Sequence, residues 1–455
     1  MKSFLTKKNG LYPLLSLILP ALVLIFRPLG LDKTQSLLLA ALLLVIFWWV
    51  VNLMPKWLSS LFLLVVFSLF GRTPLRSVYQ FPLSDNFLVI LFAFLFSQGI
   101  SNSGLTKRLL QPLFYRWIHT PGQFLLLSIL CNLALIFIIP QPFARIILFA
   151  FIVSEFLEDV CPDQTVREIL LFSVFLFSCT SNMAFLRGDI IMNNAIQSFG
   201  EVRFTEGSWA ASMTLPTLLL MAAEYFLLRL VYRRPLHGVR FCAPAVRSEG
   251  RRLERREWLE LALILATMLL MALQPLHGVP AKWIIMASTL IMFLCGLLKL
   301  PDIRSINFNL LVWLTAAFSI GNVMRGSGTA DIVFSRLSTL FPAQFDLTFL
   351  LAVILITMIL HMLLGGSVTT TSVVIPGILS IAAGKAPAAM LVLIIYILVY
   401  NHFLLPLHNA VLVIGNGDKR FPARLVAQFG GVLTLVMPLF ILFVYRLWWQ
   451  FIGIF

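Results

Sequence analysis

Apolar runs of about 20 residues recur along the whole chain, and this repetition limits the fold more than any other feature. A helix of about 20 apolar residues crosses the ~30 Å hydrocarbon core of a bilayer. Of the 455 residues, 60% are hydrophobic and 12% are charged, and the mean hydropathy is +0.96. A soluble domain carries about 25% charged residues. The sequence therefore predicts an all-α polytopic membrane protein.

The uninterrupted runs predict about eleven transmembrane helices. The first run follows Lys7 and Lys8 as a signal peptide would, but it lacks a small-residue cleavage site, so we expect an uncleaved helix. The predicted crossings lie at 11–29, 36–54, 57–71, 86–102, 167–186, 207–231, 258–274, 281–300, 308–324, 387–405 and 425–452.

Two further apolar segments, 123–157 and 347–383, are interrupted in their middles by IIPQPFAR and LLGGSVTTTSVVIP. With the N-terminus in the cytoplasm, Lys and Arg concentrate inside only if both segments return to the side they entered. The sequence therefore predicts two re-entrant hairpins and an outside C-terminus, in the cytoplasmic membrane.

The formal net charge of +15 does not indicate a nucleic-acid partner. Nine arginines lie from Arg229 to Arg256, and eight of them are in a connector that we assign to the cytoplasm at 232–257. This is the positive-inside distribution of a membrane protein, so the expected partner is the lipid bilayer and not a nucleic acid.

The two halves resemble each other in the order of their features. FLFSQGISNSGL at 94–105 and FSIGNVMRGSGT at 318–329 each precede an interrupted segment, and polar helix ends follow, with Asn-Ala at 194–195 and 409–410. We expect an N-terminal helix at 1–35 and inverted repeats at 36–231 and 258–455. Inverted repeats with broken helices are typical of secondary transporters, whose binding sites lie at the breaks.

The first interruption predicts an anion site. Prolines at 140 and 142 end the preceding helix, and the next helix should begin near Phe143 with its free N–H groups toward an anion. A charge such as Arg145 is rare inside a membrane and favours a functional role. The alternative is a structural role, in which Arg145 pairs with carbonyls or a carboxylate or reaches an interface.

A polar cluster ends the run before residue 183. Thr180, Ser181 and Asn182 could contact substrate or could join helices by hydrogen bonds. Arg187 and Asp189 follow, and they could instead form an ordinary loop pair at the membrane surface.

The second interruption offers flexible backbone and hydroxyl donors but no charged residue, so the positive character of the site should come mainly from the first half, which favours an anion over a cation. Its expected substrate-binding residues are Gly366, Ser367, Thr369 and Thr370, with Asn409 from the following polar helix end; small-residue packing is the alternative. Three histidines near it could couple protons, or could be structural: His361, His402 and His408.

The five cysteines, Cys131, Cys161, Cys179, Cys242 and Cys295, are scattered, so neither a metal cluster nor a disulfide framework is expected.

These motifs resemble the divalent anion:sodium symporter (DASS) family, in its citrate and dicarboxylate exchanger branch. PQPFAR at 140–145 lies where that branch has Pro-Ser-Asn-Thr-Ala-Arg, and Ser367-Val368-Thr369 lies at the second Ser-Asn-Thr. SQGISNSGLTKRL, FTEGSW and HNAVLVIGNG also look like family landmarks. The resemblance implies a homodimer with scaffold and transport domains, an elevator mechanism, and substrate carboxylates between the two tips, which adds Gln141 and Phe143 to the candidates.

Neither Ser-Asn-Thr motif is intact, and in sodium-coupled members these tips supply sodium ligands. Sodium is therefore a doubtful cofactor, and no other cofactor is expected. We predict a non-enzymatic secondary transporter of a small anion, di- or tricarboxylate-like or inorganic, working by exchange or cation symport. The alternatives are a transporter or flippase of a larger or lipid-linked anion, and a multipass glycosyltransferase or ligase.

Overall fold

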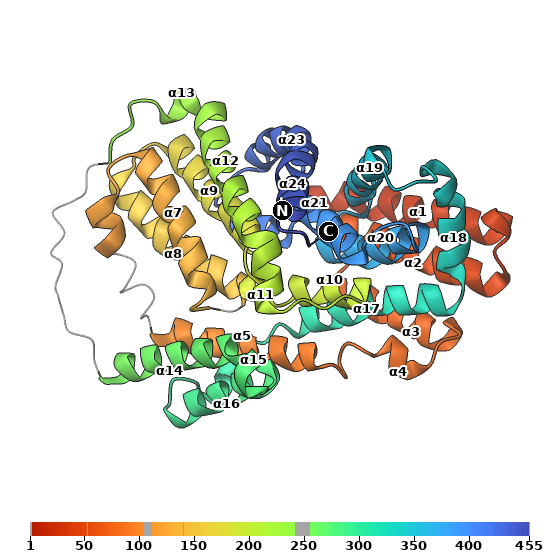
Figure 1. Ribbon diagram of the computed structural model, residues 1–455, viewed down its shortest axis with the longest axis horizontal. Coiled ribbons are helices and arrows are strands. Elements are labelled where there is room, and N and C mark those ends of the chain that lie inside the picture. Colours follow the sequence, from red (N-terminus) through yellow and green to blue (C-terminus); the bar gives the residue numbers. More distant parts are fainter. Residues whose placement is uncertain (1, 52, 104–111, 140, 242–254, 455) are drawn as a thin grey trace.

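The computed structural model describes residues 2–51, 53–103, 112–139, 141–241 and 255–454 (Figure 1). These residues form helices and no strand, which confirms the all-α prediction. The described residues do not include Pro140, half of the arginine-rich connector (242–254, with Cys242) or residues 104–109 of the SQGISNSGLTKRL stretch.

The helices of the first half follow the predicted runs closely. They are α1 Lys2–Phe26, α2 Lys33–Val51, α3 Lys56–Phe70, α4 Leu75–Val78, α5 Asp85–Ser103, α7 Pro121–Ile136, α8 Pro142–Val160, α9 Gln164–Ser181, α10 Met192–Gly200, α11 Glu206–Trp209 and α12 Leu215–Val231. A π-helical turn at Ala210–Thr214 joins α11 to α12, and 3-10 turns lie at Pro28–Gly30 and Leu186–Asp189.

The helices of the second half also follow the predicted runs. It contains α13 Arg233–Leu236, α14 Arg255–Ala272, α15 Gln274–His277, α16 Ala281–Leu294, α17 Phe308–Gly326, α18 Thr329–Leu337, α19 Leu347–Leu364, α20 Ser367–Ile381, α21 Ala388–Asn401, α22 Ala410–Gly417, α23 Ala423–Phe440 and α24 Arg446–Phe451. Short 3-10 turns lie at Leu300–Ser305, Ser338–Leu340 and Pro406–His408, and a π-helical turn at Ile441–Tyr445 precedes α24.

Several predicted runs end later than the corresponding helices, and in three cases the difference is four residues or more. The runs expected to end at 186, 300 and 405 end as helices at Ser181, Leu294 and Asn401. Apolar residues continue past each end, so hydropathy alone overestimates the helix. After Ser181 and Asn401 the chain leaves the helix inside the protein, where buried polar side chains bond the freed backbone.

Three helical stretches combine the length and apolarity needed to cross a membrane: Glu206–Val231, Leu347–Leu364 and Ala423–Phe451. Other apolar helices of the described chain, including α7, α20 and α21, are shorter. Because α19 (Leu347–Leu364) is long enough to cross, its predicted place as one arm of a re-entrant hairpin stays a prediction, as do the repeat boundaries.

Helices from the two halves lie against each other throughout the molecule (Figure 1). On one side α5 packs on α16 and α3 packs on α17, whereas α7 packs on α9 within the first half. The helix α20 contacts α10, α17 and α21 together. The second interruption is therefore surrounded by helices from both halves.

Candidate functional site

The first interruption is a tight reversal between α7 and α8. The N–H groups of Ile138 and Ile139 both bond to the carbonyl of Leu135, at 3.1 and 2.8 Å. The carbonyl of Gln141 accepts the N–H of Arg145 at 3.1 Å and so begins α8. Pro142 occupies the first helical position, where a missing N–H costs little. The helix therefore begins one residue before the predicted Phe143.

Arg145 is fully buried, and its guanidinium holds this reversal to the rest of the protein. Its Nη1 donates to the carbonyl of Ile139 at 2.8 Å. Its Nη2 donates to Asn182 Oδ1 and to the carbonyl of Gly188, both at 2.5 Å. In this structure the charge binds protein oxygen atoms at the two chain breaks, which is the structural alternative considered from the sequence.

The second interruption is built differently. Gly365 ends α19 with φ of +72°, and its N–H bonds to the carbonyl of His361 at 2.9 Å. Gly366 then precedes α20 in an extended conformation. The N–H groups of Ser367, Val368 and Thr369 open α20 and have no acceptor within their own helix. Gly366 and Ser367 are partly exposed.

The hydroxyls of this tip have distinct partners. Ser367 Oγ donates to the carbonyl of His408 at 3.0 Å, and Thr370 Oγ1 lies 2.9 Å from His361 Nδ1. Thr371 Oγ1 bonds to carbonyls of its own helix. The Thr369 hydroxyl has no hydrogen-bond partner among the residues that the structure describes. It is a donor of this tip that no described protein group uses, although the Thr369 side chain is buried.

The three candidate histidines meet behind the second tip. The ring centroid of His361 lies 5.4 Å from that of His408 and 6.2 Å from that of His402, and all three side chains are buried. His408 Nδ1 accepts the N–H groups of Leu404 and Leu405 at 3.1 and 3.2 Å. This nitrogen therefore carries no proton, and His408 holds the loop between α21 and α22.

Each interrupted hairpin docks on a break in the helix pair that follows it. In the first half the chain leaves α9 after Ser181, passes through the turn Leu186–Asp189, and resumes as α10 at Met192. In the second half it leaves α21 after Asn401 and resumes as α22 at Ala410. Asn409 caps α22, accepting the N–H of Val411 at 2.9 Å and donating to the carbonyl of Tyr400 at 3.1 Å.

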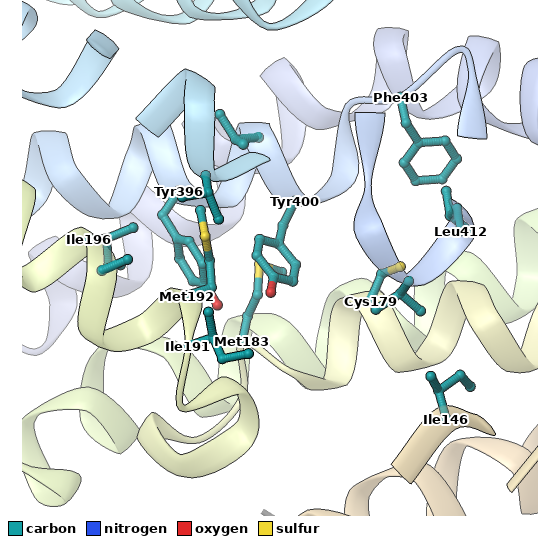
Figure 2. Close-up of a cluster of buried hydrophobic side chains, with 14 of the residues drawn as sticks. Ile146, Cys179, Met183, Ile191, Met192, Ile196, Tyr396, Tyr400, Phe403 and Leu412 are labelled. Carbon is teal, nitrogen blue, oxygen red and sulfur yellow. The ribbon is translucent and has the colours of Figure 1, made fainter. Parts of the chain in front are cut away.

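The two breaks contact each other through buried polar groups. Thr180 Oγ1 lies 3.0 Å from Asn401 Oδ1, and Asn401 Nδ2 lies 3.3 Å from the sulfur of Met183. The Tyr400 hydroxyl donates to the Asp189 carboxylate, and the Tyr396 hydroxyl donates to Asn193 Oδ1. Figure 2 shows the Tyr396 and Tyr400 rings beside Met183, Ile191 and Met192. A continuous buried core of polar and aromatic side chains thus connects the two interruptions, between α7 and α8 and between α19 and α20, with the breaks after α9 and α21.

Most of the first-half candidates lie in this core, and the exceptions are Phe143 and Arg187, which are partly exposed. Thr180, Ser181 and Asn182 are fully buried, and Ser181 Oγ bonds only to the carbonyl of Ser178 within the described chain, at 3.2 Å. Gln141 is buried, whereas Phe143 is partly exposed. Asp189 is buried and accepts the N–H groups of Ile191 and Met192 at 3.0 Å, which argues against a surface loop pair. Arg187 pairs with Glu206 at 3.2 Å.

Sequence reasoning missed four residues of the core: Glu224, Tyr396, Tyr400 and Asn401. Glu224 carried a signal, because it is an acid inside the apolar run 207–231, where an ionisable residue is functional by default. The tyrosines carried none, since Tyr is common in apolar helices. Among the described residues, no group of three or more His, Cys, Asp or Glu side chains could hold a metal ion.

Comparison with known proteins identifies the family. No curated protein matches the chain. The family model of the sodium:sulfate symporter transmembrane region matches residues 7–455, nearly the whole chain, and confirms the family resemblance although it leaves the exchanger branch a prediction. This match supports a multi-pass membrane transporter of anions. The chain therefore belongs to the sodium:sulfate symporter family.

Proposed function

We propose that this chain moves a small di- or tricarboxylate or an inorganic oxyanion such as sulfate, bound at the N-terminus of α20. The observation that carries this proposal is the tip at Gly366, Ser367 and Thr369. Three first-turn N–H groups and the Thr369 hydroxyl provide donors there, and no charged residue lies between 347 and 383. A helix N-terminus with free N–H groups favours an anion.

The first tip has a supporting role in this proposal. Arg145 fixes its backbone, and the partly exposed Phe143 supplies an N–H at the start of α8. Because Pro142 has no N–H and Arg145 already bonds three protein oxygens, this tip offers fewer donors than the second. Recognition thus rests on neutral hydrogen-bond donors, which suits an oxyanion more than a group that requires a salt bridge.

We further propose that transport does not require sodium. A sodium ion needs several oxygen ligands at about 2.4 Å, a geometry comparable to that of other hard cations. At the first tip the Gln141 carbonyl already accepts a helical N–H, and Pro142 and Phe143 offer backbone carbonyls alone. At the second tip the Ser367 hydroxyl holds His408, and Val368 lacks an amide oxygen. Anion exchange or proton coupling therefore takes the place of sodium symport.

Family resemblance also supports a homodimer with a scaffold and a moving transport domain in each subunit, two inverted repeats, and cytoplasmic N-termini. Labelling of single cysteines from each side of the membrane tests the topology. Labels at the ends of 123–157, and likewise of 347–383, should react from one side only, the two segments from opposite faces. Reaction from both sides at either segment would exclude a re-entrant hairpin there.

The function itself is tested by counterflow in proteoliposomes that contain the purified protein. Vesicles loaded with sulfate, a dicarboxylate or a tricarboxylate should take up the same labelled anion, with choline in place of sodium. A saturable, steep dependence on sodium would overturn sodium independence and leave anion transport standing. Absence of counterflow with every small anion, with or without sodium and across pH, would favour the larger, lipid-linked substrate instead.

A further inference from the structure

Glu224, on α12, is a fully buried acid that the anion site does not use. Its Oε1 lies 2.6 Å from Thr180 Oγ1, and its Oε2 has no hydrogen-bond partner among the described residues. No ion pair of the described chain includes it. An unpaired buried carboxylate is costly, so its environment favours the neutral acid.

Hydrogen-bond counting at Thr180 requires a further proton. The hydroxyl carries one hydrogen, yet it faces Glu224 Oε1 at 2.6 Å and Asn401 Oδ1 at 3.0 Å, both acceptors if Glu224 is ionised. The orientation of the Asn401 amide is fixed, because its Nδ2 donates to the carbonyl of Ile397 at 3.2 Å. If Glu224 is protonated, its O–H donates to Thr180, and Thr180 donates to Asn401.

Among the described residues no cation bonds to Glu224. The buried Arg145 on α8 reaches Asn182, two residues after Thr180, but its guanidinium is already bonded to three protein oxygens, and Arg167 and Glu168 lie at the other end of α9. The titratable side chains beside Glu224 are Cys179 from α9 and Tyr445 from the π-helical turn before α24, whose hydroxyl bonds to Thr217 at 3.0 Å. Asp189 and Tyr400 lie beyond Cys179 and add no cation. Of the other helices packed on α12, α7 carries Cys131 and the turn Ala210–Thr214 carries no titratable group.

The basic residues near α12 belong to its far end. Arg229 bonds to Tyr225, one turn further from Glu224, and the remaining cations follow the end of the helix or begin α23: Arg233, Arg234 and Arg424. A carboxyl group with no counter-charge, a hydroxyl that needs its proton and full burial all indicate the protonated form.

We propose that Glu224 is a proton-binding site, and that its proton links α12 to the two chain breaks through Thr180 and Asn401. This inference rests on the proposed anion transport, whose coupling ion it names. Release leaves a carboxylate and sends the proton to water, and rebinding restores the acid. Because Thr180 lies in the last turn of α9 and Asn401 ends α21, loss of the proton removes one hydrogen bond of the junction between the halves.

The histidines that the sequence indicated are weaker candidates for this proton. His408 Nδ1 already accepts two backbone N–H groups, so a proton on that nitrogen would displace both. His361 lies between two other histidine rings, so a charge on any of them opposes a charge on the next. Glu224 instead has a hydrogen-bond arrangement that is complete only when it is protonated.

Infrared spectroscopy of the purified full-length protein tests the protonation without transport. In the wild type, the C=O band of a protonated carboxyl should be present at pH 7 and lost at alkaline pH. The difference spectrum between wild type and Glu224→Gln, which keeps the shape and a hydrogen-bond donor, should contain this band. Glu260→Gln is the matched control, since Glu260 is also fully buried but lies on α14, and it should keep the component that Glu224→Gln loses. A spectrum of Glu224→Gln at pH 7 that equals the wild-type spectrum in this region would overturn the proposal.

A second measurement asks whether this proton couples to transport. In sodium-free proteoliposomes, the ratio of anion uptake with an external acid pH to uptake without a gradient should exceed one in wild type and in Glu260→Gln. It should fall to one in Glu224→Gln. A ratio that is unchanged in Glu224→Gln would overturn the coupling role, whereas absence of uptake in the wild type would overturn anion transport and leave the infrared result valid.

Discussion

The tip between α7 and α8 and the tip between α19 and α20 follow similar stretches of sequence, yet they are stabilised differently. A buried arginine bonds the backbone of the first, whereas the second contains no charged residue. At the first, the Arg145 guanidinium bonds Ile139, Asn182 and Gly188 and is fully buried. At the second, Gly366 and Ser367 remain partly exposed and the Thr369 hydroxyl is not engaged within the described chain. The buried charge of Arg145 thus holds the backbone of the first tip, whereas the neutral second tip has hydrogen-bond donors without a protein partner among the described residues.

This difference follows from what each break must satisfy. Backbone that leaves a helix inside a membrane needs partners for its freed groups. The first tip leaves the carbonyl of Ile139 without a helical partner, and the break after α9 does the same to the carbonyl of Gly188. The Arg145 guanidinium satisfies both. The second tip is shorter, because two glycines reverse the chain between α19 and α20. It therefore frees fewer backbone groups and needs no charged side chain to bond them.

The largest effect should come from Arg145→Gln. The substitution removes the guanidinium and leaves buried oxygen atoms without their donor, which costs about 1–3 kcal/mol for each unsatisfied group. We expect a much lower melting temperature and poor expression, and only partial recovery with Arg145→Lys, whose ammonium lacks the planar fork. Thermal unfolding of the purified variants measures this. Normal melting with abolished transport would return Arg145 to direct anion binding.

A smaller loss of stability is expected for Thr180→Val. It removes the hydroxyl that joins Glu224 to Asn401 and leaves both without that bond. Side-chain hydrogen bonds between membrane helices contribute about 0.6 kcal/mol and at most about 1.7 kcal/mol. Ser181→Ala is the control, because it removes a hydroxyl from the same helix end that bonds only within α9. Equal melting temperatures of the two variants would mean that the breaks are not joined through Thr180.

Much of this architecture could be predicted from the sequence, because long apolar runs and their interruptions depend on local composition. The proline at 142 and the glycines at 365 and 366 predict the two interruptions, and the structure ends or begins the neighbouring helices within a few residues of the predicted positions. The role of Arg145 could not be derived in the same way. Its acceptors Asn182 and Gly188 follow it by 37 and 43 residues, and the sequence does not show which oxygens meet it.

The junction between the halves was hidden for a related reason. Thr180 and Asn401 are 221 residues apart, so their contact depends on how the halves pack and not on local pattern. Glu224 was visible as an acid in an apolar run, but its partner lies in another helix. The polar residues in the apolar runs of this chain therefore predicted where a buried polar core would form, whereas their individual partners appear only in the folded arrangement.

The second tip should tolerate change at one glycine and not at the other. Gly365 has φ of +72°, a conformation that costs an alanine about 1 kcal/mol. Gly366 has φ of −136°, and an added Cβ would meet Thr369 Oγ1 at 3.5 Å, which is ordinary contact. Gly365→Ala should therefore lower the melting temperature, and Gly366→Ala should not. If Gly366→Ala leaves stability unchanged but weakens anion binding, the open tip is where the ligand approaches.

The smallest effect is expected at Thr369, and it concerns binding alone. Thr369→Val keeps the shape and removes a hydroxyl that has no partner within the described chain, so stability should not fall. If that hydroxyl donates to the anion, its loss should cost about 0.5–1 kcal/mol, or roughly a two- to fivefold higher half-saturating anion concentration in counterflow. Thr371→Val is the control two positions along, because its hydroxyl bonds to the carbonyls of Ser367 and Val368 at 2.9 and 3.1 Å. The control should lower stability slightly and leave the half-saturating concentration unchanged. If Thr371→Val raises the half-saturating anion concentration more than Thr369→Val does, the anion does not bind at the Thr369 hydroxyl.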